Sequence, residues 1–447
     1  MSKLRPVFSG GLALPRREPS DGDFSIRQMP FAPSLLLPLR QHIGRPAVPV
    51  VREGEEVERG QLLARAEGEG SLPLHAPATG YVVSIAERSD PAGGTVRVVR
   101  LDPLPGDTQE YPCGAGCDPQ SASPDELLGL IRDAGVVDLD GEATATHARL
   151  AAARAAGTGT LVLNGIDSDP VFRGVSAILR AHRDDVCLGT RCLARILGVE
   201  RLLLMVEQPD GEAARALVAA FSREPRPMLE ILAPRYPQGA EELLLRRLSH
   251  GPGKGESAPA PALCVGIATV AEIGGLLVNG HVMTDQVVTL AGGALDESGH
   301  YRVPLGTPLS FALEQAGMSA APASVLQGGM MRGDALASLE QPITKGATGY
   351  VALAEGEAPA AERALPCIRC GECIAVCPVQ LNPAELGLLA RRDMHKVMHE
   401  EYGLDICLEC GCCSYVCPSR IPLVQLFRAA RAQWRRPGAD LAGGGAH

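Results

Sequence analysis

The spacing of hydrophobic and polar positions changes along the chain, and each change marks a different kind of structure. Residues 31–122 show short alternating β patterns that are broken by glycine turns. Over residues 123–280, helix-period segments such as 145–156 alternate with short apolar runs such as 160–164. This alternation predicts an α/β domain with a mainly parallel sheet.

The C-terminal part of the chain divides again. Residues 281–335 are predicted to form strand, turn, strand and helix, as in a compact β-grasp-like module. Residues 336–437 are predicted to form a helical domain, with one helix between two cysteine motifs and another after them. Residues 1–30 indicate an extended arm that wraps another surface, and the glycine-rich residues 438–447 a disordered tail.

The first β-rich segment carries a recognisable glycine pattern. It reads V-x-x-G-x-x-V-x-x-G-Q-x-L and then H-A-P-x-x-G-x-V, which looks like a biotinyl/lipoyl-type barrel-sandwich domain. Such domains present a modified lysine at a hairpin tip. The tip here, Gly70–His75, contains no lysine, so we expect this domain to be structural and not a carrier.

Two copies of C-x2-C-x2-C-x3-C-P give the clearest chemistry. This spacing is the bacterial-ferredoxin signature for [4Fe–4S] ligation, in which the fourth cysteine of each motif serves the other cluster. It therefore predicts two [4Fe–4S] clusters with crossed ligands. The first set is Cys367, Cys370, Cys373 and Cys417, and the second set is Cys407, Cys410, Cys413 and Cys377.

Other interpretations of the cysteines fit less well. A zinc site usually takes C-x2-C pairs with a longer spacer, and disulfide frameworks belong to short secreted chains. The cysteines outside the two sets are Cys113, Cys117, Cys187, Cys192, Cys264 and Cys412. The first four could form a third metal site, but buried or free thiols are the simpler expectation. His395 and His399, one helical turn apart, are expected on a solvated face.

Composition and charge limit the classes of partner and the location that we expect for this protein. The net charge of −10 argues against a nucleic-acid partner, because phosphate binding needs an excess of Lys and Arg. The first twenty residues include arginines and no apolar run, so no secretion signal is expected. The stretch 263–279 is broken by Glu272 and by glycines, which predicts buried core and no transmembrane segment.

With these motifs, the chain resembles the RnfC family, the peripheral electron-input subunits of Rnf ion-translocating ferredoxin:NAD oxidoreductases. More distantly it resembles the flavin subunit of respiratory complex I and NqrA. The segments that carry the resemblance are Pro38–Pro46, Tyr236–Glu241, Leu365–Gly371, Cys407–Gly411 and Ser414–Val424. The resemblance implies a barrel-sandwich domain, a Rossmann-like FMN/NADH domain, an SLBB-type β-grasp module and a two-cluster domain. It also implies membrane subunits with iron–sulfur and flavin groups as partners, at the cytoplasmic face of the bacterial inner membrane.

The resemblance also implies an FMN/NADH pocket at the carboxyl ends of the parallel strands. The pocket residues would be Gly135, Gly141, Asn164, Asp167, Glu207, Tyr236, Gln238 and Gly239. The family's loop G-I-V-G-L-G-G-A-G-F-P-T is altered here, with Asp138 and Asp140 in place of glycines and Glu142 as a further carboxylate. Two like charges ~4 Å apart repel by roughly 4 kcal/mol at an effective dielectric of 20, so we expect FMN binding and direct NADH oxidation to be impaired.

Three functions follow from this resemblance. The first is an electron-transfer subunit whose two [4Fe–4S] clusters connect NADH/FMN-level and ferredoxin-level carriers, with partner subunits coupling the transfer to ion translocation. The second is a free-standing flavin-dependent NADH oxidoreductase similar to RnfC-related cobalamin reductases. The third is a docking subunit that has lost its flavin site. Absorbance spectra with and without NADH would distinguish them.

Overall fold

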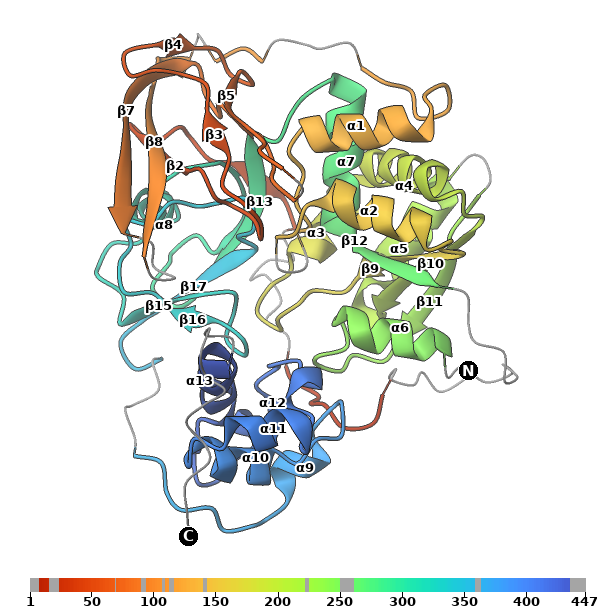
Figure 1. Cartoon of the computed structure of the whole chain (residues 1–447), viewed down its shortest axis with the longest axis vertical. Helices are drawn as coiled ribbons and strands as arrows, with labels where there is room; N and C mark the ends of the chain where they lie inside the picture. The colour runs from red at the N-terminus through yellow and green to blue at the C-terminus, as the bar shows by residue number, and fades with distance from the viewer. Residues whose placement is uncertain are drawn as a thin grey trace.

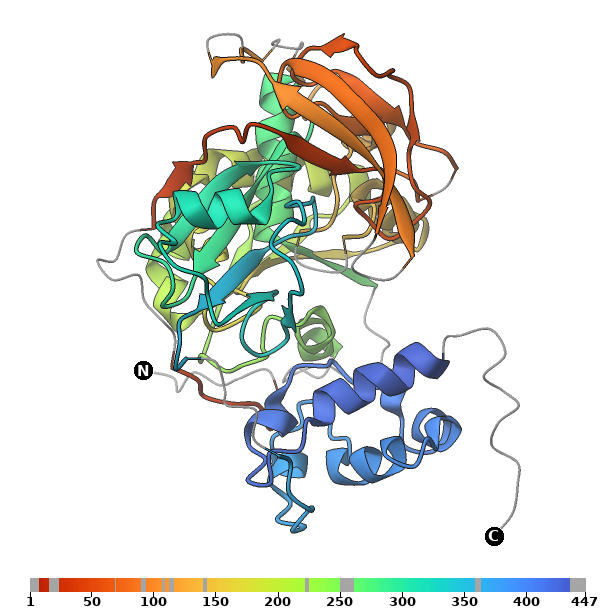
Figure 2. The same cartoon turned by 90° about the vertical axis from the view of Figure 1, so that its left-hand side faces the viewer.

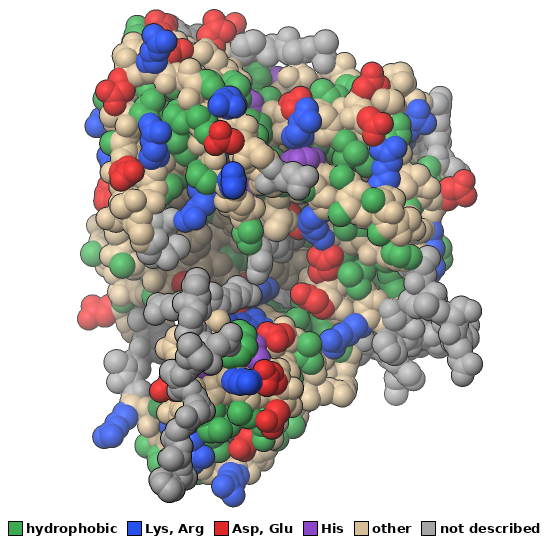
Figure 3. Space-filling model, viewed as in Figure 1, with side chains coloured by type: hydrophobic (Ala, Val, Ile, Leu, Met, Phe, Trp, Pro, Cys, Tyr) green, Lys and Arg blue, Asp and Glu red, His purple; other side chains and the backbone are tan. Residues whose placement is uncertain are grey.

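The structure, a computed structural model, describes residues 8–15, 24–68, 70–89, 94–106, 109–111, 116–139, 143–221, 225–249, 261–357 and 363–434. Gly141, Cys113 and the tail at 438–447 lie outside these ranges. Two β-rich parts, an α/β part and a helical part make up the described chain, and the helical part lies at one end of the molecule (Figure 1). Figure 3 shows acidic and basic side chains interspersed on one face.

The barrel-sandwich domain consists of two small sheets, ordered β2-β8-β7-β4 and β3-β5-β6, that share one aliphatic core. The strands are β2 (Leu35–Pro38), β3 (Val48–Pro49), β4 (Glu56–Val57), β5 (Leu62–Arg65), β6 (Leu74–His75), β7 (Gly80–Ser89) and β8 (Thr95–Pro103). The tip between β5 and β6 is held by another part of the chain, because the Pro73 carbonyl accepts a hydrogen bond from Lys345 Nζ at 3.0 Å. This contact suits a structural domain.

The α/β domain contains the parallel sheet expected from the sequence, with strand order β11-β10-β9-β12. Its strands are β9 (Thr160–Gly165), β10 (Arg201–Glu207), β11 (Met228–Leu232) and β12 (Ala262–Gly266). Its helices are α1 (Pro124–Asp133), α2 (Thr146–Ala155), α3 (Gly174–Ala181), α4 (Arg183–Leu197), α5 (Gly211–Ala220), α6 (Glu241–Ser249) and α7 (Ile267–Asn279). One core joins the sheet to α1, α3, α4, α5 and α7, and a smaller one joins it to α6.

Helix α1 begins with a capping box. Ser123 Oγ accepts from the Glu126 amide at 3.3 Å, and Glu126 Oε2 accepts from the Ser123 amide at 2.7 Å. These two bonds satisfy amides that have no partner within the helix. Helix α1 therefore has a satisfied N-terminus.

The next part is a mixed sheet with the order β1-β14-β13-β17-β15-β16. Its elements are β1 (Ile26–Gln28), β13 (Asp285–Ala291), β14 (Gly299–Pro304), β15 (Ser324–Gln327), β16 (Asp334–Ala335), β17 (Gly349–Leu353) and the packed helix α8 (Leu309–Gln315). β1 comes from the predicted arm and pairs with β14, where Ile26 lies opposite His300. β17 lies inside the sheet, so the sheet continues beyond residue 335, where the helical domain was expected to begin.

The helical domain packs around Leu386, Met398, Leu404 and Phe427. Its helices are α9 (Glu372–Ala375), α10 (Pro383–Ala390), α11 (His395–Glu400), α12 (Cys412–Tyr415) and α13 (Leu423–Trp434). Figure 2 shows this domain below the other parts, with α13 in dark blue on the side nearer to them.

The single helix expected between the cysteine motifs is in fact two. The chain turns between α10 and α11, and Asp393 adopts a left-handed conformation with φ 54° there. His399 does not lie on a solvated face as expected. Its ring stacks on Trp434 with centroids 5.0 Å apart and is hydrogen-bonded to Asp405 at 2.7 Å, because the turn directs α11 toward α13.

Contacts between distant segments hold the parts together. In the arm, the Gly11 amide donates to the Val376 carbonyl at 2.9 Å, and Leu12 and Tyr236 exchange backbone hydrogen bonds. Lys345 Nζ donates to the Gly135 carbonyl at 2.7 Å as well as to Pro73, and burial lowers its pKa to about 7. Among the described helices, none combines the length and apolarity needed to cross a bilayer.

Candidate metal centre

The two cysteine motifs fold into the same local structure. Each forms a turn that leads into a one-turn helix, α9 in the first motif and α12 in the second. Arg369 and Glu409, at corresponding positions, have φ of 57° and 49°, and Gln380 and Arg420 have φ of 59° and 52°. Positive φ is uncommon for residues other than glycine, so its recurrence at matching positions shows that both motifs require this turn.

The left-handed turns are accompanied by backbone amides that donate to cysteine sulfur atoms. The pairs are Arg369 N to Cys367 Sγ at 3.4 Å, Glu409 N to Cys407 Sγ at 3.4 Å, Leu381 N to Cys377 Sγ at 3.2 Å and Ile421 N to Cys417 Sγ at 3.5 Å. Amide donors of this kind stabilise thiolate ligands and raise the reduction potential of the group they hold.

The second cysteine set surrounds a small cavity between the motifs. Four thiols of this set, Cys377, Cys407, Cys410 and Cys413, line it together with Cys412. Cys377 belongs to the first motif, so the chain brings its fourth cysteine across to the second. Burial, followed by the charges of Cys410, Cys407 and Cys377, raises the pKa of Cys413.

The first set shows the reciprocal crossing. Burial raises the pKa of Cys373, and the charges of Cys370, Cys417 and Cys367 raise it further. Cys417 of the second motif therefore lies near the three leading cysteines of the first. The two sets differ in exposure, since Cys370 is exposed whereas Cys377 and Cys410 are buried.

The donor set fits iron–sulfur chemistry better than a single metal ion. Thiolates are soft ligands that select zinc, copper(I) or iron–sulfur clusters. Zinc sites usually take C-x2-C pairs with a longer spacer, whereas both motifs here repeat the four-cysteine spacing of [4Fe–4S] ligation. A cubane takes one thiolate at each corner.

The cysteines outside the two sets have ordinary surroundings where they are described. Cys187 and Cys192 lie on α4 in the main core of the α/β domain, and Cys117 packs against the same core. Burial raises the pKa of Cys187 to about 11 and of Cys192 to about 12, so these thiols remain protonated. Cys412 is fully buried beside Cys410.

The second set lies against the α/β domain. Tyr236, in the loop between β11 and α6, donates its hydroxyl hydrogen bond to the Cys410 carbonyl at 2.7 Å. The same tyrosine packs with Cys410, Cys412 and the partly buried Met331. Tyr236 thus contacts the cysteine domain, and it also lines a small cavity with the predicted pocket residues Asp167, Glu207, Gln238 and Gly239.

Most of the other predicted pocket residues do come together. Asn164 Nδ2 donates to the Gly239 carbonyl at 2.9 Å, and Gln238 Nε2 donates to Glu207 Oε1 at 3.2 Å. Asp167 accepts from the Val175 amide at 2.9 Å and the Ser176 hydroxyl at 3.0 Å at the start of α3. Gly135 lies at the end of α1, where its carbonyl binds Lys345.

An arginine that sequence reasoning missed pairs with Asp138, one of the carboxylates that replace glycine in the altered loop. Arg149 on α2 pairs with Asp138, donates twice to Glu241 at 2.8 and 2.9 Å, and reaches the Cys264 carbonyl at 3.1 Å. The Leu139 amide donates to Thr269 Oγ1 at 2.9 Å. The three carboxylates at 138, 140 and 142 were the one sequence signal that a counter-ion was needed.

The described residues of this arrangement leave little room for FMN. The cavity beside Glu207, Tyr236 and Gly239 measures about 20 Å³, which is room for about one water molecule. A phosphate at the loop would meet the Asp138 carboxylate, and Arg149 beside it is already engaged by two carboxylates.

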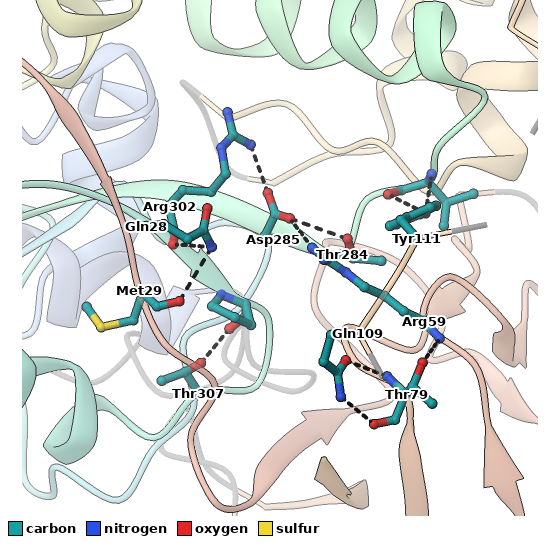
Figure 4. Close-up of polar contacts among 12 residues, drawn as sticks. Gln28, Met29, Arg59, Thr79, Gln109, Tyr111, Thr284, Asp285, Arg302 and Thr307 are labelled. Carbon is teal, nitrogen blue, oxygen red and sulfur yellow. Dashed lines mark hydrogen bonds and ion pairs between the residues drawn. The ribbon is translucent and has the colours of Figure 1, made fainter. Parts of the chain in front are cut away.

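A larger cavity of about 420 Å³ lies where the barrel-sandwich, α/β and mixed-sheet parts meet. Its wall includes Arg59 and Arg302, which both pair with Asp285, at 3.1 and 2.8 Å (Figure 4). Carboxylates outnumber the arginines in its lining, which includes Asp167, Asp185, Glu272 and Asp285. The excess of carboxylates in this wall would repel a phosphate group.

Family models match three segments of the chain. The RnfC barrel sandwich hybrid domain matches residues 6–103, the Nuo51 FMN-binding domain residues 131–280 and the 4Fe-4S dicluster domain residues 363–421. The barrel-sandwich and two-cluster domains expected from the sequence are thus confirmed. The α/β domain is a member of a flavin-binding fold family whose loop has changed in this chain.

Curated relatives share nearly the whole chain. The C component of the ion-translocating oxidoreductase complex of Pseudomonas aeruginosa is 38% identical over 97% of this chain and 56% of its own length. The C component of the proton-translocating ferredoxin:NAD(+) oxidoreductase complex of Clostridium ljungdahlii is 30% identical over 89% and 87%. The chain therefore spans little more than half the length of the first relative.

Solved structures of an NAD+-reducing [NiFe]-hydrogenase are similar in fold. The air-oxidized form has a TM-score of 0.50 and 16% identity and covers 70% of this chain and 64% of its own. The H2-reduced form has a TM-score of 0.50 and 17% identity over 74% and 68%.

Proposed function

Since the chain belongs to the RnfC family of ion-translocating oxidoreductase components, we propose that it is an electron-transfer subunit of such a complex. Its two cysteine sets would hold two [4Fe–4S] clusters, connecting NADH/FMN-level with ferredoxin-level carriers. The observation that supports the proposal is that Cys377 of the first motif lines one cavity with Cys407, Cys410 and Cys413 of the second, and that both motifs have matching turns and amide-to-sulfur hydrogen bonds.

The ligands of the first cluster would be Cys367, Cys370, Cys373 and Cys417, and those of the second Cys407, Cys410, Cys413 and Cys377. When bound, such clusters supply one-electron redox chemistry. The chain's own residues orient the thiolates by left-handed turns and donate amide hydrogen bonds to sulfur. They also bury Cys410 against Tyr236, which limits the access of water to this ligand.

The remaining features of the complex follow from the family. We place the chain as a peripheral subunit at the cytoplasmic face of the bacterial inner membrane, with iron–sulfur and flavin-carrying membrane subunits as partners. We also infer that the mixed sheet is an SLBB-type β-grasp module, because the hairpin β13–β14 is followed by the packed helix α8. We assign no site to FMN or NADH, since Arg149 is paired with Asp138 and Glu241 where a phosphate would have to bind.

Metal content and ligand exchange test the proposal. The reconstituted protein is expected to bind about eight irons and to show the broad absorbance and low-temperature EPR signals of reduced [4Fe–4S] clusters. Cys192→Ser serves as a control that changes a buried cysteine outside both sets. Half the iron in the wild-type protein would overturn the two-cluster assignment.

A second set of variants tests whether each cluster takes its fourth cysteine from the other motif. In a variant with Cys367, Cys370 and Cys373 all replaced by serine, one cluster should remain. Adding Cys417→Ser should leave that cluster unchanged, whereas adding Cys377→Ser should lower its iron content and alter its EPR signal. The opposite result would show that each motif keeps its own fourth cysteine.

A flavin-dependent NADH oxidoreductase is the alternative, because the α/β domain matches a flavin-binding family. Flavin absorbance bands that bleach on adding NADH would favour this alternative and would contradict the inference that FMN has no site beside Arg149. A cluster spectrum that NADH leaves unchanged is the expected result.

A further inference from the structure

The first cysteine set is surrounded by exposed apolar side chains. Leu365, Ile368, Ile374 and Tyr415 are 59%, 68%, 44% and 62% exposed, and each lies within two residues of a cysteine of this set. In Figure 1 the segment that leads into α9 runs along the lower edge of the molecule, away from the sheets. Neighbouring exposed apolar side chains of this kind mark interaction sites.

The two cysteine motifs can be compared position by position, because the equivalent face of the second motif is covered by another part of the chain. At Gly411 of the second motif, an added Cβ would lie 2.3 Å from the Met331 carbonyl, so the backbone of another domain packs there. A Cβ added at the corresponding Gly371 of the first motif would have no atom of another described segment within 4 Å. Leu408 is partly buried against the cluster of Tyr236 and Cys410, whereas its counterpart Ile368 is exposed. The same structural face is thus covered in one motif and open in the other.

Charge at the repeat-related turn indicates the kind of partner. In the covered motif, Glu409 pairs with Arg428 at 2.9 Å and with Arg431 at 2.7 Å. In the open motif the same position is Arg369, which is exposed together with Arg363 at the edge of the same face. Glu372 is exposed there as well, so the exposed arginines of residues 363–377 exceed the exposed carboxylates by one. The chain as a whole carries a net charge of −10, so this local excess of arginine favours an acidic surface opposite it.

We propose that the face formed by Leu365, Ile368, Arg369, Ile374 and Tyr415 docks an acidic redox protein, with the exposed Cys370 at its centre. This inference rests on the proposed electron-transfer function and adds the partner's chemistry and its place of contact. The apolar side chains supply the buried centre of the interface and Arg369 its charged rim. An anionic bilayer has the same charge, but Cys370 at the centre suits a partner that carries a one-electron centre of its own.

Binding measurements on the iron-loaded full chain test the proposal. The probe is an acidic ferredoxin with [4Fe–4S] clusters, titrated by isothermal calorimetry at low and high salt. Ile368→Asp and Arg363→Glu, the latter at the exposed arginine next to the cysteine motif, are each expected to weaken binding about tenfold or more, since one removes apolar contact and the other reverses charge. Added salt should weaken wild-type binding more than that of Arg363→Glu.

Matched controls place similar changes elsewhere on the surface. Met228→Asp replaces a side chain that is 64% exposed on β11, and Arg391→Glu changes the charge of a residue that follows α10. Both should bind the ferredoxin within about twofold of wild type. Equal binding by Ile368→Asp and wild type, or binding to anionic vesicles without binding to the ferredoxin, would overturn the docking face.

Iron content separates this proposal from the one it rests on. Each variant is expected to keep the iron content and EPR signals of the wild type, because the changed side chains lie at the surface and are not cluster ligands. Low iron in the wild-type protein would count against the clusters themselves. Full iron with unchanged ferredoxin binding in every variant would count against the docking face alone.

Discussion

Arg149 decides what the loop between α1 and α2 can hold. Its guanidinium joins Asp138, Glu241 and the Cys264 carbonyl, which come from different segments of the α/β domain. The Asp138 side chain is nearly buried, so its charge depends on this partner. A carboxylate in a low-dielectric site costs several kcal/mol unless it is paired and hydrogen-bonded.

Replacing Arg149 therefore has a predictable effect. Arg149→Ala should lower the free energy of unfolding by about 2–3 kcal/mol, because Asp138 then loses its guanidinium counter-ion while it stays buried. Arg154→Ala on the same helix removes a pair with the exposed Asp125 and should cost less than about 0.5 kcal/mol. Urea unfolding followed by circular dichroism compares the two, and similar losses would contradict the role given to Arg149.

Lys345 gives the stability a defined pH dependence. Burial lowers its pKa from 10.5 to about 7 in the folded chain. Between these values the unfolded chain binds more protons, so the contribution of Lys345 to the free energy of unfolding rises with pH, by up to about 1.4 kcal/mol per unit. The difference between wild type and Lys345→Met should follow this rise from about pH 7 to about pH 10. Parallel stability curves for the two proteins would show that Lys345 does not titrate in this window.

For single residues, the sequence predicts a chemical role where a short motif contains all the residues involved. The cysteine motifs contain their own ligands, so all eight cysteines could be proposed from their spacing. Arg149 could not, because Asp138 and Glu241 reach it only after the sheet has formed. His399 was misplaced for the same reason, since Trp434 covers it from a later helix.

At the scale of single elements, helices with capping residues and strands with continuous apolar runs were predicted well. β9 extends only one residue beyond the run expected at 160–164. The break between α10 and α11 was missed, because Asp393 carries no strong helix-ending signal although it adopts a left-handed conformation. β1 was missed because its partner β14 lies far along the chain.

The capping box of α1 provides the test at this scale. Ser123→Ala removes the oxygen that accepts the Glu126 amide and should lower the free energy of unfolding by about 1 kcal/mol. Ser121→Ala, which removes an exposed hydroxyl from a turn two residues earlier, should change it by less than about 0.5 kcal/mol. Thermal unfolding of both variants measures the difference, and an unchanged Ser123→Ala midpoint would exclude a role for the cap.

At the scale of the molecule, the order of the parts was predictable and their contacts were not. The helical domain is joined to the mixed sheet by Arg428, which bonds Asp334 at 2.7 Å, the Arg332 carbonyl at 2.6 Å and Glu409 at 2.9 Å. Asp334 and Arg428 lie on separate domains, so no local pattern links them. Such contacts depend on how the domains fold against one another.

Arg428 should therefore control how firmly the helical domain is held. Arg428→Ala should speed amide hydrogen exchange in α12 and α13 and lower the local free energy of opening by about 1 kcal/mol. Lys396→Ala, which breaks an exposed pair with Glu400, should leave exchange in these helices unchanged. Equal amide hydrogen exchange in wild type and Arg428→Ala would show that other contacts hold the helical domain against the mixed sheet.

The arm at residues 8–15 also sets an order of events during synthesis. It leaves the ribosome well before its hydrogen-bond partners, which lie at Tyr236 and Val376. At translation rates of about 5–20 residues per second, Val376 follows the arm by roughly 20–70 s. The arm can bind Tyr236 earlier, but its binding site is complete only when Val376 of the first cysteine motif has been made. A nascent chain stalled before that motif would hold the arm by its contacts with the α/β domain alone.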